Sequence, residues 1–345
     1  MAFRHRLANR VLFVIAVTSL GAACLDQVPH NARAAVLHGL GVMGDSGSDG
    51  SSVNKWPGML QADRGLNFGG SGLPYNHAVG GATSTTLLNP QHQDTALASN
   101  VTAGNVTTGI IFIGNNDYGN AATSILSGSL SGAALTNFEN TVANNIETAS
   151  QTVLNAGAEG FLLGSVNNFA FEPAAAAATP AQKLQLENSI TNVNNQLIAF
   201  ADAKHVPYVD FFGLEKSVLA TNATSIIIGG VPISLTATGS SQLDFFQDAL
   251  HPNIVGNAII ANMWMAALNK AYDTNLPLFT DQQILSLAGL SGYTGETFST
   301  STNLSNFIHF VPAPEPSTAL LAVIGFALLA GRALRTLGRS SVASR

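Results

Sequence analysis

Short apolar runs alternate along the chain with longer segments in which apolar positions recur at helical spacing. Runs of strand length between helices favour a parallel sheet covered by helices. The pattern predicts five strands, at residues 36–42, 76–79, 107–113, 160–166 and 206–211. It predicts helices at residues 55–64, 133–156, 180–204 and 254–271. The expected fold class is therefore α/β.

Local signals refine this outline. Pro57 suits the first turn of a helix, and Thr179-Pro180 is typical of a helix start. The Gly-, Ser- and Ala-rich segment 118–132 is interpreted as an inserted loop, and the proline-bounded Ala run in 172–180 as a connector. Residues 225–234 place two apolar runs around a Gly-Gly pair, which predicts a hairpin.

Both ends of the chain have the composition of addressing segments. Three arginines in the first ten residues precede an uncharged run at 11–25, the layout of a secretory signal peptide. Cleavage after Ala34 would make 1–34 the signal. A competing site before Cys24 would allow lipidation of that cysteine.

At the other end, Pro314-Glu315-Pro316 opens an uncharged stretch at 316–331 that is followed by four arginines. A helix of that length spans about 24 Å, slightly less than the roughly 30 Å hydrocarbon core of a bilayer. Arginines favour the cytoplasmic side, which would place the preceding chain outside. This tail resembles the PEP-CTERM sorting signal. The resemblance implies that 313–345 is read by a sorting enzyme after the export machinery, and that 35–312 reaches the surface or matrix of a bacterium; an ordinary anchor helix is the alternative.

The folded domain is acidic and lacks cysteine. Without the two ends, six basic and 18 acidic residues remain, a formal net charge of −12. Such a charge disfavours nucleic-acid partners. Because Cys24 is the only cysteine in the chain, residues 35–312 cannot form disulfides, thiolate metal sites or a cysteine nucleophile.

Candidate catalytic residues follow the predicted strands. Ser46 comes directly after the first strand, at the edge of the sheet where α/β folds bind ligands. Asp248 and His251 are close enough for the carboxylate to hold one imidazole nitrogen while the other accepts a serine proton. The sequence therefore predicts a nucleophile, a general base and its orienting acid.

An ester hydrolase also needs donors for the oxyanion that forms when serine attacks a carbonyl. The Asn116 side-chain amide and the backbone N–H groups of Gly81 and Ser46 all lie after predicted strands, on one expected edge of the sheet. The chemistry requires no metal or cofactor, and His92 with Asp94 lacks a third ligand at suitable spacing.

Four segments together resemble the GDSL, or SGNH, hydrolase family: 44–49, 76–82, 114–117 and 248–252. The resemblance implies a three-layer α/β/α sandwich with a mainly parallel, flavodoxin-like sheet, and it is nearest to the lipase/esterase branch. Gly47 stands where the family has leucine, which puts the rigidity of the serine loop in question. The chain contains no Gly-x-Ser-x-Gly elbow, which disfavours an ordinary α/β-hydrolase.

The sequence thus predicts an exported serine esterase or lipase that acts on a lipid, a small acyl ester or an acetylated polysaccharide. The alternative is a surface or matrix binding protein that keeps the fold without activity. The presence of all five candidate residues favours the enzyme.

Overall fold

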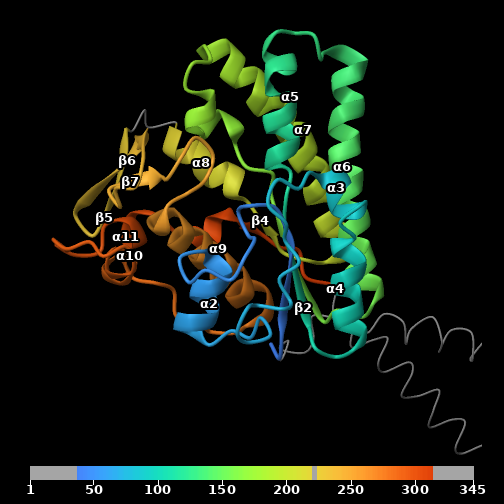
Figure 1. Cartoon of the computed structure of the whole chain (residues 1–345), viewed down its shortest axis with the longest axis horizontal. Coiled ribbons are helices and arrows are strands. Elements are labelled where there is room, and N and C mark those ends of the chain that lie inside the picture. Colours follow the sequence, from blue (N-terminus) through green and yellow to red (C-terminus); the bar gives the residue numbers. More distant parts are fainter. Residues whose placement is uncertain (1–36, 220–223, 314–345) are drawn as a thin grey trace, which may run out of the picture. The chain divides into compact units, whose positions relative to one another are not determined.

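The computed structural model describes residues 37–219 and 224–313, and within them one parallel sheet organises the fold (Figure 1). Its strands lie in the order β1 (Leu40–Gly44), β2 (Thr108–Phe112), β3 (Gly160–Gly164), β4 (Tyr208–Val209) and β8 (Ile308–His309). The first four run parallel, whereas β8 pairs antiparallel with β4. The mainly parallel α/β fold predicted from the sequence is confirmed.

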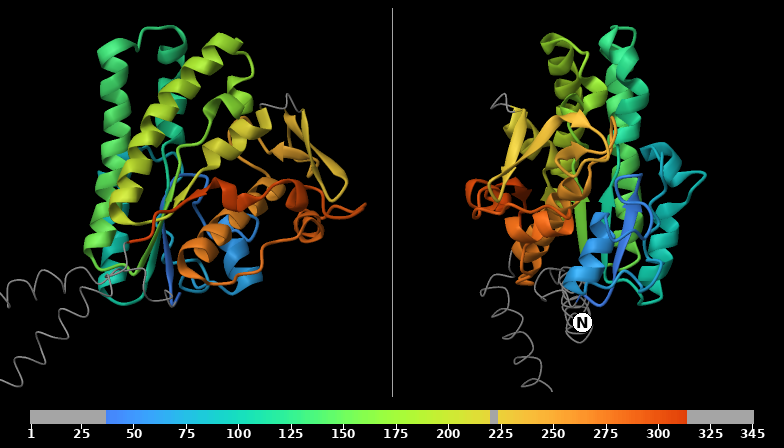
Figure 2. Two further views of the ribbon diagram at one scale, coloured as in Figure 1. Left: turned by 180° about the vertical axis from the view of Figure 1, so that it is seen from behind. Right: turned by 60° about the vertical axis from the view of Figure 1, so that its left-hand side comes forward.

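Helices cover both faces of this sheet (Figure 2). Alternate strand residues point to opposite sides, so Ile110 and Leu162 join one apolar core while Ile111 and Leu163 join the other. The first core contains α2 (Trp56–Arg64) and α9 (Ile254–Tyr272). The second contains α4 (Gln93–Thr102), α6 (Gly132–Asn155) and α7 (Pro180–Lys204). Strands buried on both faces explain why the sequence shows continuous apolar runs.

The four long helices predicted from the sequence are all present within about two residues of their expected ends. Thr179 accepts a hydrogen bond from the Gln182 N–H and forms a capping box before Pro180. The predicted hairpin is also present: β5 (Ser225–Ile228) pairs antiparallel with β6 (Val231–Thr238) around Gly229-Gly230. The short strand β7 (Asp244–Phe246) extends it into a second, three-stranded sheet.

Two predictions about elements were wrong. The segment 118–132 is not a loop, because α5 (Asn115–Leu126) occupies most of it and buries Tyr118, Ala122 and Ile125 on one face. Residues 76–79 do not form a strand. They lie beside β1, with a bridge between Asn76 and Val42. The Asn76 side chain accepts a hydrogen bond from Ala78 N–H and donates one to the Ser48 carbonyl of the turn after β1.

The remaining elements are short. They comprise α3 (Ser84–Leu88), α8 (Phe211–Leu219), α10 (Asp281–Leu287), α11 (Phe298–Ser301), η1 (Phe169–Phe171), η2 (Pro173–Ala175) and η3 (Leu304–Phe307). Within the described ranges, no helix has both the length and the apolar character needed to cross a bilayer. The predicted signal peptide at 1–34 and the sorting tail from residue 314 onward, with its apolar stretch at 316–331, lie outside the described residues.

Candidate active site

Ser46 lies on a tight turn directly after β1. The Asp45 carbonyl accepts hydrogen bonds from the Ser48 and Asp49 N–H groups, and the Asp45 carboxylate accepts one from Gly47 N–H at 2.9 Å. Lys55 donates to the Ser46 carbonyl at 2.7 Å and forms an ion pair with Asp49. Hydrogen bonds to Asp45 within the turn and from Lys55 outside it therefore fix the backbone at Ser46, although Gly47 has no side chain that could pack against the turn.

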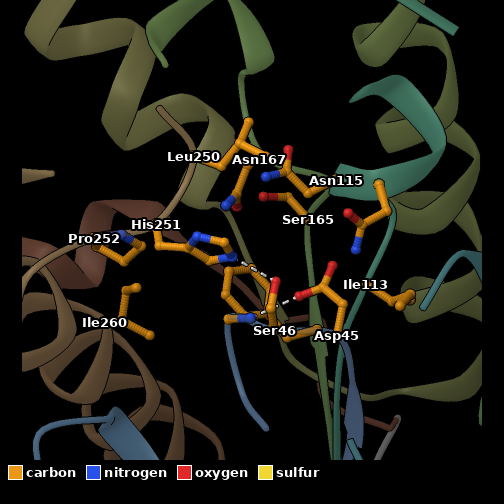
Figure 3. Close-up of a pocket in the computed structure, with 13 residues that line it drawn as sticks. Asp45, Ser46, Ile113, Asn115, Ser165, Asn167, Leu250, His251, Pro252 and Ile260 are labelled. Carbon is orange, nitrogen blue, oxygen red and sulfur yellow. Dashed lines mark hydrogen bonds between the residues drawn. The ribbon is translucent and has the colours of Figure 1, made fainter. Parts of the chain in front are cut away.

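His251 and Asp248 lie on the loop between β7 and α9. The tertiary structure brings the His251 side chain to Ser46 (Figure 3). His251 Nε2 is 2.8 Å from Ser46 Oγ, and His251 Nδ1 is 2.8 Å from an Asp248 carboxylate oxygen. An ionised carboxylate only accepts hydrogen bonds, so Nδ1 carries a proton and Nε2 is the nitrogen that faces the serine hydroxyl.

Asp248 is suited to remain ionised in this arrangement. Its own partial burial raises its pKa, but hydrogen bonds donated by Leu250 N–H, His251 N–H and the imidazole outweigh that effect and hold the pKa below its ordinary value. Both backbone bonds are 2.8 Å long. The carboxylate consequently fixes the orientation of the imidazole.

Asn116 lines the same small cavity as Ser46 and His251. It lies in the first turn of α5, and its side-chain amide donates to the Ala82 carbonyl at 2.9 Å. The next residue, Asp117, is buried and accepts from both the N–H and the hydroxyl of Ser84 at 2.8 Å. The Asn116 bond joins segment 114–117 to segment 76–82, and the Asp117 bonds hold the start of α3 beside them.

Gly81 occupies a different position from the other candidates. It is exposed, has a φ of +76° and is not among the residues that line the cavity at Ser46. Its neighbour Ala82 contacts Asn116, so the structure places Gly81 beside the site rather than in its wall. A left-handed backbone of this kind favours glycine.

Several residues of the cavity were missed by the sequence reasoning. Asn115, Ser165, Asn167, Leu250 and Ile260 also line it. Ser165 and Asn167 directly follow β3, so the same strand-end rule that selected Ser46 and Asn116 could have found them. Glu172 lies in the segment interpreted as a connector, and nothing in its local sequence marks it as a site residue. Its carboxyl group accepts a hydrogen bond from Asn115 Nδ2 at 2.6 Å.

A second carboxyl group lies next to the serine. Burial raises the pKa of Asp45 to about 6, against the opposing effects of the Gly47 N–H and the charge of His251.

Among the residues that the structure describes, no group of three His, Cys, Asp or Glu side chains is placed to hold a metal ion.

A sheet of parallel strands that carries a Ser-His-Asp chain at the carboxyl end of β1 has the arrangement of a hydrolase site. The chain belongs to the GDSL-like lipase/acylhydrolase family, whose model matches residues 40–264. At the level of the family it is thus an ester hydrolase. No curated protein matches the chain.

Solved structures with a similar fold share little sequence with it. A phospholipase A1 from Streptomyces albidoflavus is 13% identical over 68% of this chain and 100% of its own, with a TM-score of 0.44. An extracellular lipase from Streptomyces rimosus is 18% identical over 68% and 99%, with a TM-score of 0.41. The acetyl xylan esterase AlAXEase is 16% identical over 66% and 98%, with a TM-score of 0.42. The family assignment rests on the family model and not on these likenesses.

Proposed function

We propose that this protein is a serine esterase that hydrolyses carboxylic esters through an acyl-enzyme on Ser46. The observation that carries the proposal is the continuous chain from Ser46 Oγ to His251 Nε2 and from His251 Nδ1 to Asp248, with 2.8 Å at each step. This arrangement supplies a nucleophile, a general base and the group that orients the base.

In the proposed reaction, His251 takes the Ser46 proton as the serine oxygen attacks the ester carbonyl. The Asn116 amide and the Ser46 N–H stabilise the oxyanion, and the N–H of Gly81, which lies beside the cavity, is the third candidate donor. His251 then gives its proton to the departing alcohol, which leaves the acyl group on Ser46. Water, deprotonated by His251, releases the acid and restores the hydroxyl.

We further propose that the enzyme is exported and acts outside the cell. The support is the basic and apolar start of the chain together with the Pro-Glu-Pro, apolar and arginine-rich end, which a membrane-bound sorting enzyme would process. Detection of the protein and of its processed ends in cell fractions tests this part.

The catalytic proposal is tested with a chromogenic ester series from acetyl to long acyl, using the full-length protein beside Ser46→Ala. Loss of turnover by about 10⁴-fold or more in the variant is expected. A fluorophosphonate probe should also label the wild-type protein and leave the variant unlabelled. A folded wild-type protein with neither turnover nor labelling would favour the non-catalytic surface or matrix protein instead.

A further inference from the structure

The cavity at Ser46 adjoins a second cavity with mostly apolar walls. The two share Asn167, Leu250, Pro252 and Ile260. Beyond these residues the second cavity is lined mainly by phenylalanine and aliphatic side chains, including Phe171, Phe245, Phe246, Leu214 and Ile259. Neither Ser46 nor His251 lines it, so it lies behind the reacting atoms. An acyl chain attached to Ser46 can extend into it.

The second cavity is small. Its volume is about 60 Å³, whereas a single water needs roughly 10–15 Å³ on the same measure. It therefore has room for a short chain of about four carbon atoms.

Polar atoms without partners gather where the two cavities meet. Asn115 Oδ1, Asn167 Oδ1 and Glu172 Oε2 are buried and have no hydrogen-bond partner within the described part of the chain. Asn115 and Asn167 line the first cavity, and Asn167 and Glu172 line the second. Figure 3 shows Asn115, Asn167 and Leu250 together at the end of the cavity opposite Ser46 and Asp45. A bound ligand that offers these atoms no hydrogen bond leaves them unpaired and is disfavoured.

Glu172 is the least exposed member of this group, at 4%. Burial raises its pKa well above the ordinary value, opposed by the Asn115 hydrogen bond and reinforced by the charges of Glu215, Asp45 and Asp248. A neutral carboxyl group has an O–H donor besides its acceptor oxygen. The polar corner formed by Asn115, Asn167 and Glu172 therefore offers two amide oxygens as hydrogen-bond acceptors and one carboxyl group that can donate a hydrogen bond.

A hydroxyl group matches this corner because it donates one hydrogen bond and accepts others. An anionic substituent would meet the nearby carboxylates, and a plain alkyl chain would leave the three oxygens unpaired. In the empty enzyme, water can fill the corner, and a ligand hydroxyl that replaces the water keeps its hydrogen bonds.

We propose that the two cavities form an acyl subsite for a short chain of about four carbons that carries a hydroxyl group near the ester carbonyl, with Asn115, Asn167 and Glu172 as the residues that select it. The inference rests on the proposed esterase function and names its substrate class.

The segment that carries Glu172 is bound to the loop that carries His251, because Ala174 N–H donates a hydrogen bond to the Ala249 carbonyl at 3.0 Å.

The test compares p-nitrophenyl butyrate with p-nitrophenyl 2-hydroxybutyrate and 3-hydroxybutyrate, each enantiomer separately, on the full-length protein. At least one hydroxy ester should have a kcat/KM about tenfold or more above butyrate. Glu172→Met should remove this preference, so that the kcat/KM of the hydroxy esters falls to that of butyrate in the same variant. Glu172→Gln, which keeps a donor and an acceptor, should retain it.

Asn167→Leu provides a second variant in case Glu172→Met does not fold, and it should lose the preference likewise. Glu159→Met, the same change at an exposed carboxylate outside both cavities, is the control. Equal rates on butyrate and all hydroxy esters, or a preference that survives both cavity variants, would overturn the subsite and leave the esterase intact. Absence of turnover on every ester together with an unlabelled Ser46 would overturn the proposed function and this inference with it.

Discussion

At the scale of single residues, the site depends on three side chains whose polar atoms meet, although Ser46 lies far along the chain from the neighbouring pair Asp248 and His251. Ser46 and His251 are separated by 205 residues, yet their reacting atoms are 2.8 Å apart. Local hydrogen bonds prepare each partner beforehand: the Asp45 turn presents the serine, and the Asp248 carboxylate orients the imidazole. Preorganisation of this kind is what lowers a barrier without binding the substrate more tightly.

Asn116→Ala should lower kcat for ester hydrolysis by about 10²–10³-fold with little change in KM, because an oxyanion donor acts mainly in the transition state. Steady-state kinetics on one short-chain ester measures the effect. Asn120→Ala, a change at an exposed position of the same helix, is the control. A rise in KM with unchanged kcat would mean that Asn116 only binds the substrate.

Asp45 should make the protein less stable as pH rises. Its folded pKa of about 6 is above the ordinary value of 3.8, so the folded state binds more protons between these values. The contribution is present below about pH 4 and is lost as pH rises through 6, and it amounts to about 3 kcal/mol.

Urea unfolding of the wild-type protein and Asp45→Asn at pH 4, 5, 6 and 7 measures this contribution. The difference between the two proteins should change with pH over that window, and Asp63→Asn, at an exposed carboxylate, should show no such change. A difference that is constant with pH would contradict the assignment.

At the scale of elements, the start of α5 positions Asn116. Gly114 precedes the helix with a φ of +118°, and a Cβ there would lie 2.6 Å from a methyl group of Val166. The backbone therefore turns sharply against Val166, in the segment that follows β3, before the helix begins, and glycine is the residue that permits it.

Gly114→Ala should destabilise the fold by about 2–4 kcal/mol, the sum of backbone strain and overpacking, and should reduce the esterase rate through Asn116. Gly104→Ala is a matched control, because Gly104 also has a positive φ, +74°, but a Cβ there meets no atom within 4 Å. Chemical unfolding and ester hydrolysis are measured on both variants. Equal costs at the two glycines would show that contact with Val166 is unimportant.

At the scale of the whole domain, one buried carboxylate joins the hairpin to the C-terminal helices. Asp281 is 0% exposed and accepts hydrogen bonds from the N–H groups of Gly229, Thr297, Phe298 and Ser299. Burial alone would raise its pKa, but these backbone bonds lower it overall. Its stabilising effect is therefore present above the ordinary carboxyl pKa and is lost as pH falls through the lower folded value.

Asp281→Ala should cost about 3–5 kcal/mol at neutral pH, because several buried N–H groups lose their acceptor. Asp63→Ala, at an exposed position, should cost less than about 0.5 kcal/mol. Urea unfolding monitored by far-UV circular dichroism gives both values. A loss below about 1 kcal/mol in Asp281→Ala would mean that water replaces the carboxylate without penalty.

Much of the architecture and the positions of the candidate residues could be predicted from local pattern. The spacing of apolar residues predicts the long helices, and the capping residue Thr179 predicts the start of one of them. The glycine pair at Gly229 predicts the hairpin. The segment 118–132 was wrongly predicted to be a loop because its Gly and Ser content is typical of loops. Burial of Tyr118, Ala122 and Ile125 in the second core stabilises a helix there instead.

By itself, the sequence determined the α/β class, the strand ends that carry Ser46 and Asn116, and the Asp248-His251 pair, since each depends on neighbours only a few residues away. The tertiary structure alone decided that His251 reaches Ser46, that Gly81 lies beside the cavity, and that Glu172 meets Asn115 behind the site. Such contacts join segments far apart in the chain, so they depend on how helices pack across the sheet. No local pattern of hydrophobic and polar residues records that packing.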